Sequence, residues 1–184
     1  TVIERGREAL AGERVERIEA YPMIPSILVW RVVARVPEGW IATRIHLLGG
    51  SQRQRRITED GGPWVERARA LPEADTFRWF TDDMVRYATS ESLGGNHVVE
   101  LHDMRYAMQP EGTEALWKLR IRFASDGQVQ EIVFYHVREQ GEELHLETRM
   151  RLAGRSPQRM IALARHLQIH DERIPGTLRY HYRI

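Results

Sequence analysis

The fold is decided by the stretch Trp117-Lys118-Leu119-Arg120-Ile121-Arg122-Phe123. Apolar and basic side chains alternate at every position of this stretch, as is typical of a β-strand with one face on the core and the other in water. The turn residues Asp126-Gly127 follow, a second strand is predicted over 129–138, and Gly141 leads into a third over 144–152. Three strands joined by short turns predict an antiparallel meander.

The same alternation appears earlier in the chain. Apolar residues occupy the even positions from Leu28 to Val36, the turn Pro37-Glu38-Gly39 follows, and alternation resumes to residue 48, so 28–48 is predicted to be a β-hairpin. Residues 49–63, with two glycine pairs, are expected to form a loop or a ragged strand. The aromatic segment 76–87 is predicted to start as a strand, and 97–106 to form another.

Helices are expected at both ends and once between. The charged segment 3–19 predicts a short exposed helix that runs into a strand, and 64–71 predicts one or two helical turns before Pro72. Ser156-Pro157 combines an N-cap with a proline at the first helical position, so an amphipathic helix is expected over 157–169. The tail from Thr177 is expected to end in a short strand.

These elements predict a single α+β domain over residues 1–184. It would contain an antiparallel, mostly meander sheet of about seven or eight strands, an N-terminal helix and a C-terminal amphipathic helix. Residues 1–14 are assigned to a connector helix, 15–154 to the sheet, and 155–184 to a basic helix and tail.

Composition excludes several functional classes. The chain has 184 residues, is 42% hydrophobic and 29% charged, and has a net charge of +1 and no cysteine. The absence of cysteine excludes disulfides, thiol catalysis and cysteine-based metal sites. No signal peptide and no run of ~20 apolar residues is present, so a soluble chain is expected. From Arg149 onward, eight arginines stand against two acidic residues. These arginines either solvate the outer faces of a strand and a helix, which is the preferred interpretation, or contact an anionic lipid surface. Specific nucleic-acid binding is not expected, because aromatic residues suited to base stacking are few there.

Candidate metal ligands are weak. His166 and His170 are spaced i, i+4 on the predicted helix, but without the interposed glutamate of a HExxH site. A second set contains His97, Glu100, His102 and Asp103. In a strand, Glu100 and His102 share a face whereas Asp103 lies opposite, so a structural interpretation is preferred.

Three segments carry a family resemblance: Pro25–Val33 (PSILVWRVV), Phe77–Phe80 (FRWF) and Leu101–Tyr106 (LHDMRY). Together they resemble the C-terminal soluble part of the predicted membrane-bound, metal-dependent hydrolases related to the LexA-regulated inner-membrane hydrolase. The resemblance covers roughly residues 15–138.

The resemblance implies that this chain is an extramembrane domain, cut from a longer protein that precedes Thr1. The divalent metal would be held by a membrane-embedded N-terminal part, which would also be this chain's partner, and this chain would hold no cofactor. Its location would be the soluble side of the bacterial inner membrane, with the cytoplasm as the alternative. Within the chain, Arg31, Asp103 and Arg105 are expected to pair on a polar face of the sheet, with Trp79 beside them as a core or binding aromatic. If these residues line a groove, Arg31 and Arg105 are the candidates for binding an anion.

Three functions remain open from the sequence. The first is a non-catalytic accessory or regulatory domain of such a membrane-bound hydrolase, not an enzyme by itself. The alternative is a self-contained protein that binds an apolar or anionic small ligand within a curved β-sheet. The third is a hydrolase that uses His166, His170 and nearby carboxylates.

Overall fold

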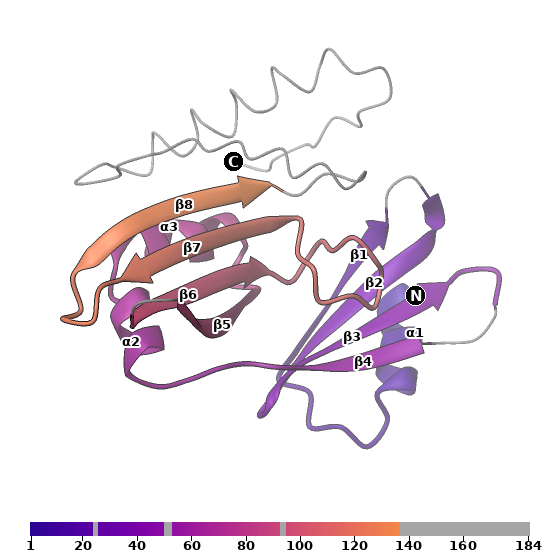
Figure 1. The fold of residues 1–184 in the computed structure, drawn as a ribbon. Coiled ribbons are helices and arrows are strands. Elements are labelled where there is room, and N and C mark those ends of the chain that lie inside the picture. Colours follow the sequence, from indigo (N-terminus) through magenta and orange to yellow (C-terminus); the bar gives the residue numbers. More distant parts are fainter. Residues whose placement is uncertain (24–25, 50–52, 93–94, 137–184) are drawn as a thin grey trace, which may run out of the picture. The chain divides into compact units, whose positions relative to one another are not determined.

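The computed structural model describes residues 1–23, 26–49, 53–92 and 95–136. Two helix-then-strand units follow each other along this part of the chain (Figure 1). The first contains α1 (Val2–Ala9), β1 (Arg17–Met23), β2 (Ser26–Val36), β3 (Gly39–His46) and β4 (Arg53–Thr58). The second contains α2 (Pro63–Arg69), α3 (Pro72–Phe80), β5 (Val85–Ser92), β6 (Asn96–Asp103), β7 (Trp117–Phe123) and β8 (Val129–His136).

Each unit contains one four-stranded antiparallel sheet with neighbouring strands in chain order. The α+β class and the meander arrangement are therefore confirmed. A single sheet of seven or eight strands, continuous from residue 15, is wrong for the described residues. Among the described strands, β4 pairs only with β3 and β5 only with β6, and the chain between β4 and β5 forms α2 and α3.

The predicted hairpin over 28–48 is β2 and β3, which pair from Val29 with His46 to Val36 with Gly39. Gly39 has a φ of +133°, and a Cβ built on it would lie 2.5 Å from the carbonyl oxygen of Ile57. The close approach of β4 thus requires glycine at this turn. The segment predicted as a loop or ragged strand contains β4, an edge strand in which Ile57 alone is buried.

Helix α1 lies on one face of the first sheet. Thr1 caps it with a reciprocal capping box to Glu4, and Leu10 packs with Ala34, Val36 and Ile41. The N-terminal helix predicted from the charge pattern is confirmed, and it ends earlier than the expected connector at residue 14.

The second sheet is covered on one face by α2 and α3. Its core joins Val65 and Ala68 of α2, Ala74 and Phe77 of α3, and alternate residues of β5, β6 and β7. The alternation that predicted the strand at 117–123 is confirmed, since Leu119, Ile121 and Phe123 are buried in this core. No helix among the described residues is long and apolar enough to cross a membrane.

The two sheets contact each other within one compact unit. An apolar cluster connects the first sheet to Met84 and Met104, which flank strands of the second. Its members from the first sheet are Val33, Trp40, Ala42 and Ile57. The strand predicted over 144–152, the helix over 157–169 and the final tail lie outside the described residues.

Candidate functional site

Arg31 joins the first sheet to the loop that follows β6. It comes from β2 and has only 1% of its surface exposed. Its Nε donates to the carbonyl oxygen of Met104 at 3.0 Å, and its Nη1 donates to those of Pro110 at 2.6 Å and Gly112 at 3.0 Å. Nη1 also reaches the carbonyl of Gln109 at 3.4 Å. The loop after β6 therefore surrounds this guanidinium with backbone oxygens.

That loop is held in shape by its own backbone. Ala107 forms an isolated bridge with Ala115, the N–H of Met108 donates to Glu114, and the N–H of Gly112 donates to Gln109 at 2.8 Å. Because the loop is closed independently of Arg31, its carbonyl groups are positioned to accept from the guanidinium.

The buried position affects the charge state of Arg31. Burial lowers the pKa of Arg31 to about 10, while the negative charges of Asp103 and Glu111 act against this shift. Arg31 is thus a cation at neutral pH, and hydrogen bonds to carbonyl dipoles compensate for the water it has lost.

Asp103 and Arg105 form the second part of this site. Asp103 ends β6 and is fully buried, and its carboxylate accepts from Nε of Arg105 at 3.0 Å and from Nη2 at 2.9 Å. The backbone N–H of Arg105 donates to the same carboxylate at 3.0 Å. Burial raises the pKa of Asp103, and the hydrogen bonds from Arg105 act against that rise.

Aromatic rings enclose the guanidinium of Arg105. It lies over the ring of Phe80 at 5.2 Å and over that of Tyr106 at 5.6 Å. Tyr106 in turn contacts Tyr21 of β1, with ring centroids 5.5 Å apart. Burial raises the pKa of the Tyr21 hydroxyl, so this phenol stays neutral at physiological pH.

We call Arg31, Asp103, Arg105 and the carbonyl groups of residues 104–112 the intersheet joint. The three segments that carry the family resemblance meet in it. Arg31 of the first segment bonds to Met104 of the third, and Arg105 of the third lies over Phe80 of the second. The residues predicted to gather are thus close together, but they connect two sheets and do not share a polar face of one.

The position of Trp79 differs from the prediction. Residues 72–80 form α3 and not a strand, and Trp79 is 64% exposed on it. Pro72 at the helix start and Glu73 and Asp75 in the first turn favour the helix, and these signals were available in the sequence. The aromatics at 77 and 80 are spaced i, i+3, which places them on one helical face that excludes Trp79.

A second polar cluster lies on β6 and β7. His102 Nε2 is 3.1 Å from Glu100 Oε2, and Nε of Arg120 donates to Glu100 Oε1 at 2.7 Å. These hydrogen bonds, that of His102 first, lower the pKa of Glu100 to about 2, although burial opposes the change.

The second set of candidate metal ligands, His97, Glu100, His102 and Asp103, is therefore not brought together at one place. Asp103 lies on the opposite face and pairs with Arg105, as the alternation predicts, and His97 stacks on Trp64 at 4.1 Å. Within the part of the chain that the structure describes, no three such side chains are placed to hold a metal ion. His166 and His170 lie outside that part.

No known family model, curated protein or solved structure matches this chain.

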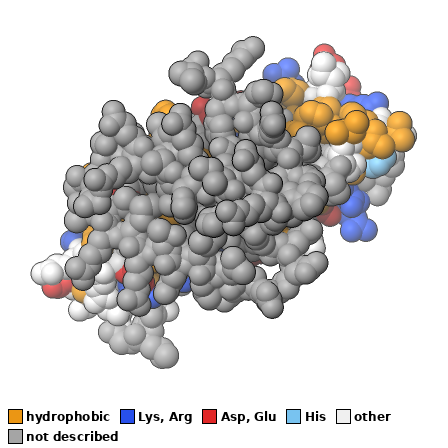
Figure 2. Space-filling model, turned by 90° about the horizontal axis from the view of Figure 1, so that it is seen from above, with side chains coloured by type: hydrophobic (Ala, Val, Ile, Leu, Met, Phe, Trp, Pro, Cys, Tyr) orange, Lys and Arg blue, Asp and Glu red, His pale blue; other side chains and the backbone are white. Residues whose placement is uncertain are grey.

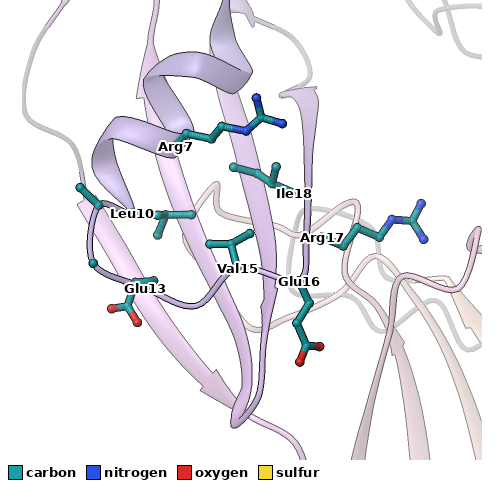
Figure 3. A pocket seen from close by; sticks show the side chains of 9 residues that line it. Arg7, Leu10, Glu13, Val15, Glu16, Arg17 and Ile18 are labelled. Atoms are coloured by element: carbon teal, nitrogen blue, oxygen red, sulfur yellow. The ribbon is translucent and has the colours of Figure 1, made fainter.

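A hollow of about 560 Å³ lies beside α1 and not inside a curved sheet (Figure 3). Leu10, Val15 and Ile18 supply its apolar lining. Its charged lining has both signs, from Arg7, Arg17, Glu13 and Glu16. Arg17 is already bonded to Asp82, with Nη2 at 2.6 Å from Oδ2. The hollow is separate from every residue of the intersheet joint.

The alternation in the sequence does not predict that Arg31 is buried. The alternation in 28–36 assigns Arg31 to the wet face of the strand, yet Val29 and Val33 share that face with it. In the structure Arg31, Val32, Val33 and Ala34 are all buried, because β2 is covered on both faces. An arginine between two valines on the presumed polar face was the available clue.

Proposed function

We propose that this chain is a non-catalytic accessory domain of a larger membrane-bound protein related to the predicted metal-dependent hydrolases. The observation that carries the proposal is the meeting of the three family-like segments in the intersheet joint. Sequence segments that contact one another in a fold are expected to occur together in proteins with that fold. The resemblance therefore concerns the architecture of an extramembrane domain and not a catalytic centre.

The chemistry of the joint supports a structural role. A general acid, a general base or an anion-binding arginine must reach its substrate. The carboxylate of Asp103 is fully buried against Arg105, and the guanidinium of Arg31 is enclosed by carbonyl oxygens. These groups act on each other, and they stabilise the contact between the sheets.

In this proposal the divalent metal and the chemistry belong to the membrane-embedded part of the parent protein. The domain lies on the soluble side of the bacterial inner membrane and has a docking or regulatory role beside the bilayer. Its basic C-terminal segment, from Arg149, is a further candidate for contact with anionic lipid.

Metal analysis and hydrolysis assays of the purified chain test the non-catalytic role. We expect substoichiometric zinc, manganese and iron after purification without chelator, and no hydrolysis of ester or phosphoester substrates above the buffer rate. One tightly held metal ion per chain, lost in His166→Ala together with a hydrolytic activity, would support the hydrolase alternative and overturn the proposal.

The hollow beside α1 favours a second candidate function, the binding of a small amphipathic anion. Its volume lies in the range of small-molecule sites, and it combines an apolar lining with Arg7 and Arg17. Glu13 and Glu16 line it too, and Glu13 is already paired with Arg56. Medium-chain fatty acids would then raise the melting temperature, and Arg7→Ala would abolish the rise. An unchanged melting temperature with saturating fatty acid would remove this candidate.

A further inference from the structure

One end of the first sheet exposes a cluster of large apolar side chains. Ile27 is 75% exposed and Leu48 78%, and Leu28, the next residue of β2, is 37% exposed. The start of β2 and the end of β3 are adjacent, because Val29 pairs with His46 and the N–H of Leu47 donates to Leu28 at 2.8 Å. We call Ile27, Leu28 and Leu48 the apolar tip.

The exposed apolar side chains form a visible group. Figure 2 shows hydrophobic atoms gathered at the right of the view, the side on which the first sheet lies in Figure 1, with basic and histidine side chains beside them. Large aliphatic side chains are costly to expose unless something covers them. Such a group therefore indicates a contact surface.

The backbone of the apolar tip is fixed by hydrogen bonds. The indole Nε1 of the half-buried Trp30 donates to the carbonyl of Ile27 at 2.8 Å. Arg5 of α1 donates to the carbonyl of Leu47 at 2.9 Å, and His46 Nδ1 accepts from the N–H of Leu48 at 3.3 Å. The tip is thus held in place and need not be ordered on binding, which favours association.

Three arginines lie on β3 and β4 of the same sheet, and Arg44 and Arg53 are nearer to the tip than Arg55. Arg44 pairs in register with Arg53, and Arg55 lies two residues along the same face of β4. Within residues 1–23, 26–49, 53–92 and 95–136, none of these three arginines has an ion-pair partner. By contrast, Arg56 on the opposite face pairs with Glu13.

The charge around these arginines is one-sided. From Ser26 to Thr58 the sequence has six arginines and one acidic residue, Glu38, which lies in the turn at the other end of β2 and β3. Of the six, Arg31 is buried, and two are paired with glutamates outside this range, Arg35 with Glu59 and Arg56 with Glu13. Glu4 of α1, next to Arg5, is bonded to the terminal ammonium of Thr1. A surface of this kind attracts a dense array of negative charges.

We propose that the apolar tip inserts into the interfacial region of an anionic phospholipid bilayer while Arg44, Arg53 and Arg55 contact the headgroup phosphates. This deepens the proposed function and rests on it, since it names the surface beside which the accessory domain lies. Aliphatic side chains flanked by arginines are the combination that binds membrane interfaces. A nucleic acid would use the arginines but would leave Ile27 and Leu48 without a role.

Vesicle flotation with the purified full chain tests the proposal. We expect binding to vesicles of phosphatidylcholine mixed with phosphatidylglycerol, and at least about tenfold weaker binding to phosphatidylcholine alone. The double variant Ile27→Asp/Leu48→Asp should reduce binding to the mixed vesicles about tenfold or more, because the aspartates lose the apolar contact and repel the headgroups. The matched control Val129→Asp changes an exposed residue of the second sheet and should bind as the wild type does.

A second pair of variants tests the arginines. Arg53→Glu/Arg55→Glu should abolish the preference for anionic vesicles, whereas Arg14→Glu, an exposed arginine in the loop after α1, should leave it unchanged. All variants lie at exposed positions, and circular dichroism would verify their folding.

The vesicle experiments test the lipid contact separately from the non-catalytic role of the chain. If wild type and all variants bind equally, the lipid contact lies elsewhere, for instance in the C-terminal segment, and the inference is wrong. If the chain binds labelled RNA through Arg53 and Arg55 but no vesicles, the inference is also wrong. Neither result bears on the metal analysis, which alone decides whether the chain is catalytic.

Discussion

Arg31 on β2 donates a hydrogen bond from Nε to the carbonyl oxygen of Met104, 73 residues later in the chain and 3.0 Å away. With the carbonyls of Pro110 and Gly112, this bond fixes the loop after β6 against the first sheet. This buried cation thus adds polar contacts to the apolar cluster that joins the first sheet to Met84 and Met104. Hydrogen bonds in a buried setting depend strongly on the residues that make them.

Arg31→Met is therefore expected to destabilise the fold by about 3–5 kcal/mol, because it leaves several buried carbonyl groups without a donor. Arg44→Met is the matched control, since Arg44 pairs in register with Arg31 but is only half-buried and has no described ion pair. Its cost should stay within about 0.5 kcal/mol. Urea unfolding measures both, and a loss below about 1 kcal/mol for Arg31→Met would contradict the role of the joint.

Glu100 makes stability depend on pH. Its pKa is lowered from 4.5 to about 2 in the folded protein, so the carboxylate stabilises the fold above the unfolded pKa. That contribution is lost as the pH falls from about 4.5 to 2. Glu100→Gln should cost about 2 kcal/mol at pH 7 and a little under half of that at pH 3, where the folded-state carboxylate is still mostly ionised.

The control for this experiment is Glu91→Gln, since Glu91 is exposed on β5. Denaturation curves at both pH values would give four free energies of unfolding. An equal effect of Glu100→Gln at pH 7 and pH 3 would show that the carboxylate charge does not contribute.

Gly39→Ala should destabilise the first sheet by about 2–4 kcal/mol. The φ of +133° is strained for alanine, and the new Cβ would lie 2.5 Å from the carbonyl oxygen of Ile57. Gly61→Ala provides the comparison, because its Cβ would meet no atom within 4 Å. Thermal unfolding of the two variants measures the difference, and equal melting temperatures would argue against the close approach of β4.

Two aromatic residues of α3 should respond very differently to truncation. Phe77→Ala removes a fully buried ring from the second core and should cost about 3–5 kcal/mol. Trp79→Ala removes an exposed ring and should cost less than about 1 kcal/mol. A large loss for Trp79→Ala would instead support the expectation from the sequence that this ring belongs to a core.

The sequence predicts the strands better than it predicts their assembly. The hairpin of β2 and β3 and the strand at 117–123 follow from alternation, which depends only on local geometry. The aromatic content of 76–87 predicts that this segment starts as a strand, which is wrong, because 72–80 form a helix whose start signal is Pro72. The division into two sheets depends on which strands pair, and no local pattern specifies that between β4 and β5.

The sequence predicts that three of the candidate residues lie close together, but it does not predict what they contact. Arg31, Asp103 and Arg105 do lie together. Their role as a joint depends on the loop at 104–112, whose backbone carbonyls accept from Arg31. Every residue has a backbone carbonyl group, so the order of residue types does not show which carbonyls accept a hydrogen bond. A contact of this kind is identified from the structure.

The central claim is that this chain is a domain of a larger membrane-bound protein. The most direct test is fractionation of the source cells, followed by immunoblotting with an antibody raised against the purified chain. The account predicts a band well above 21.5 kDa that stays in the membrane pellet after an alkaline carbonate wash. A band at 21.5 kDa in the soluble fraction would contradict it.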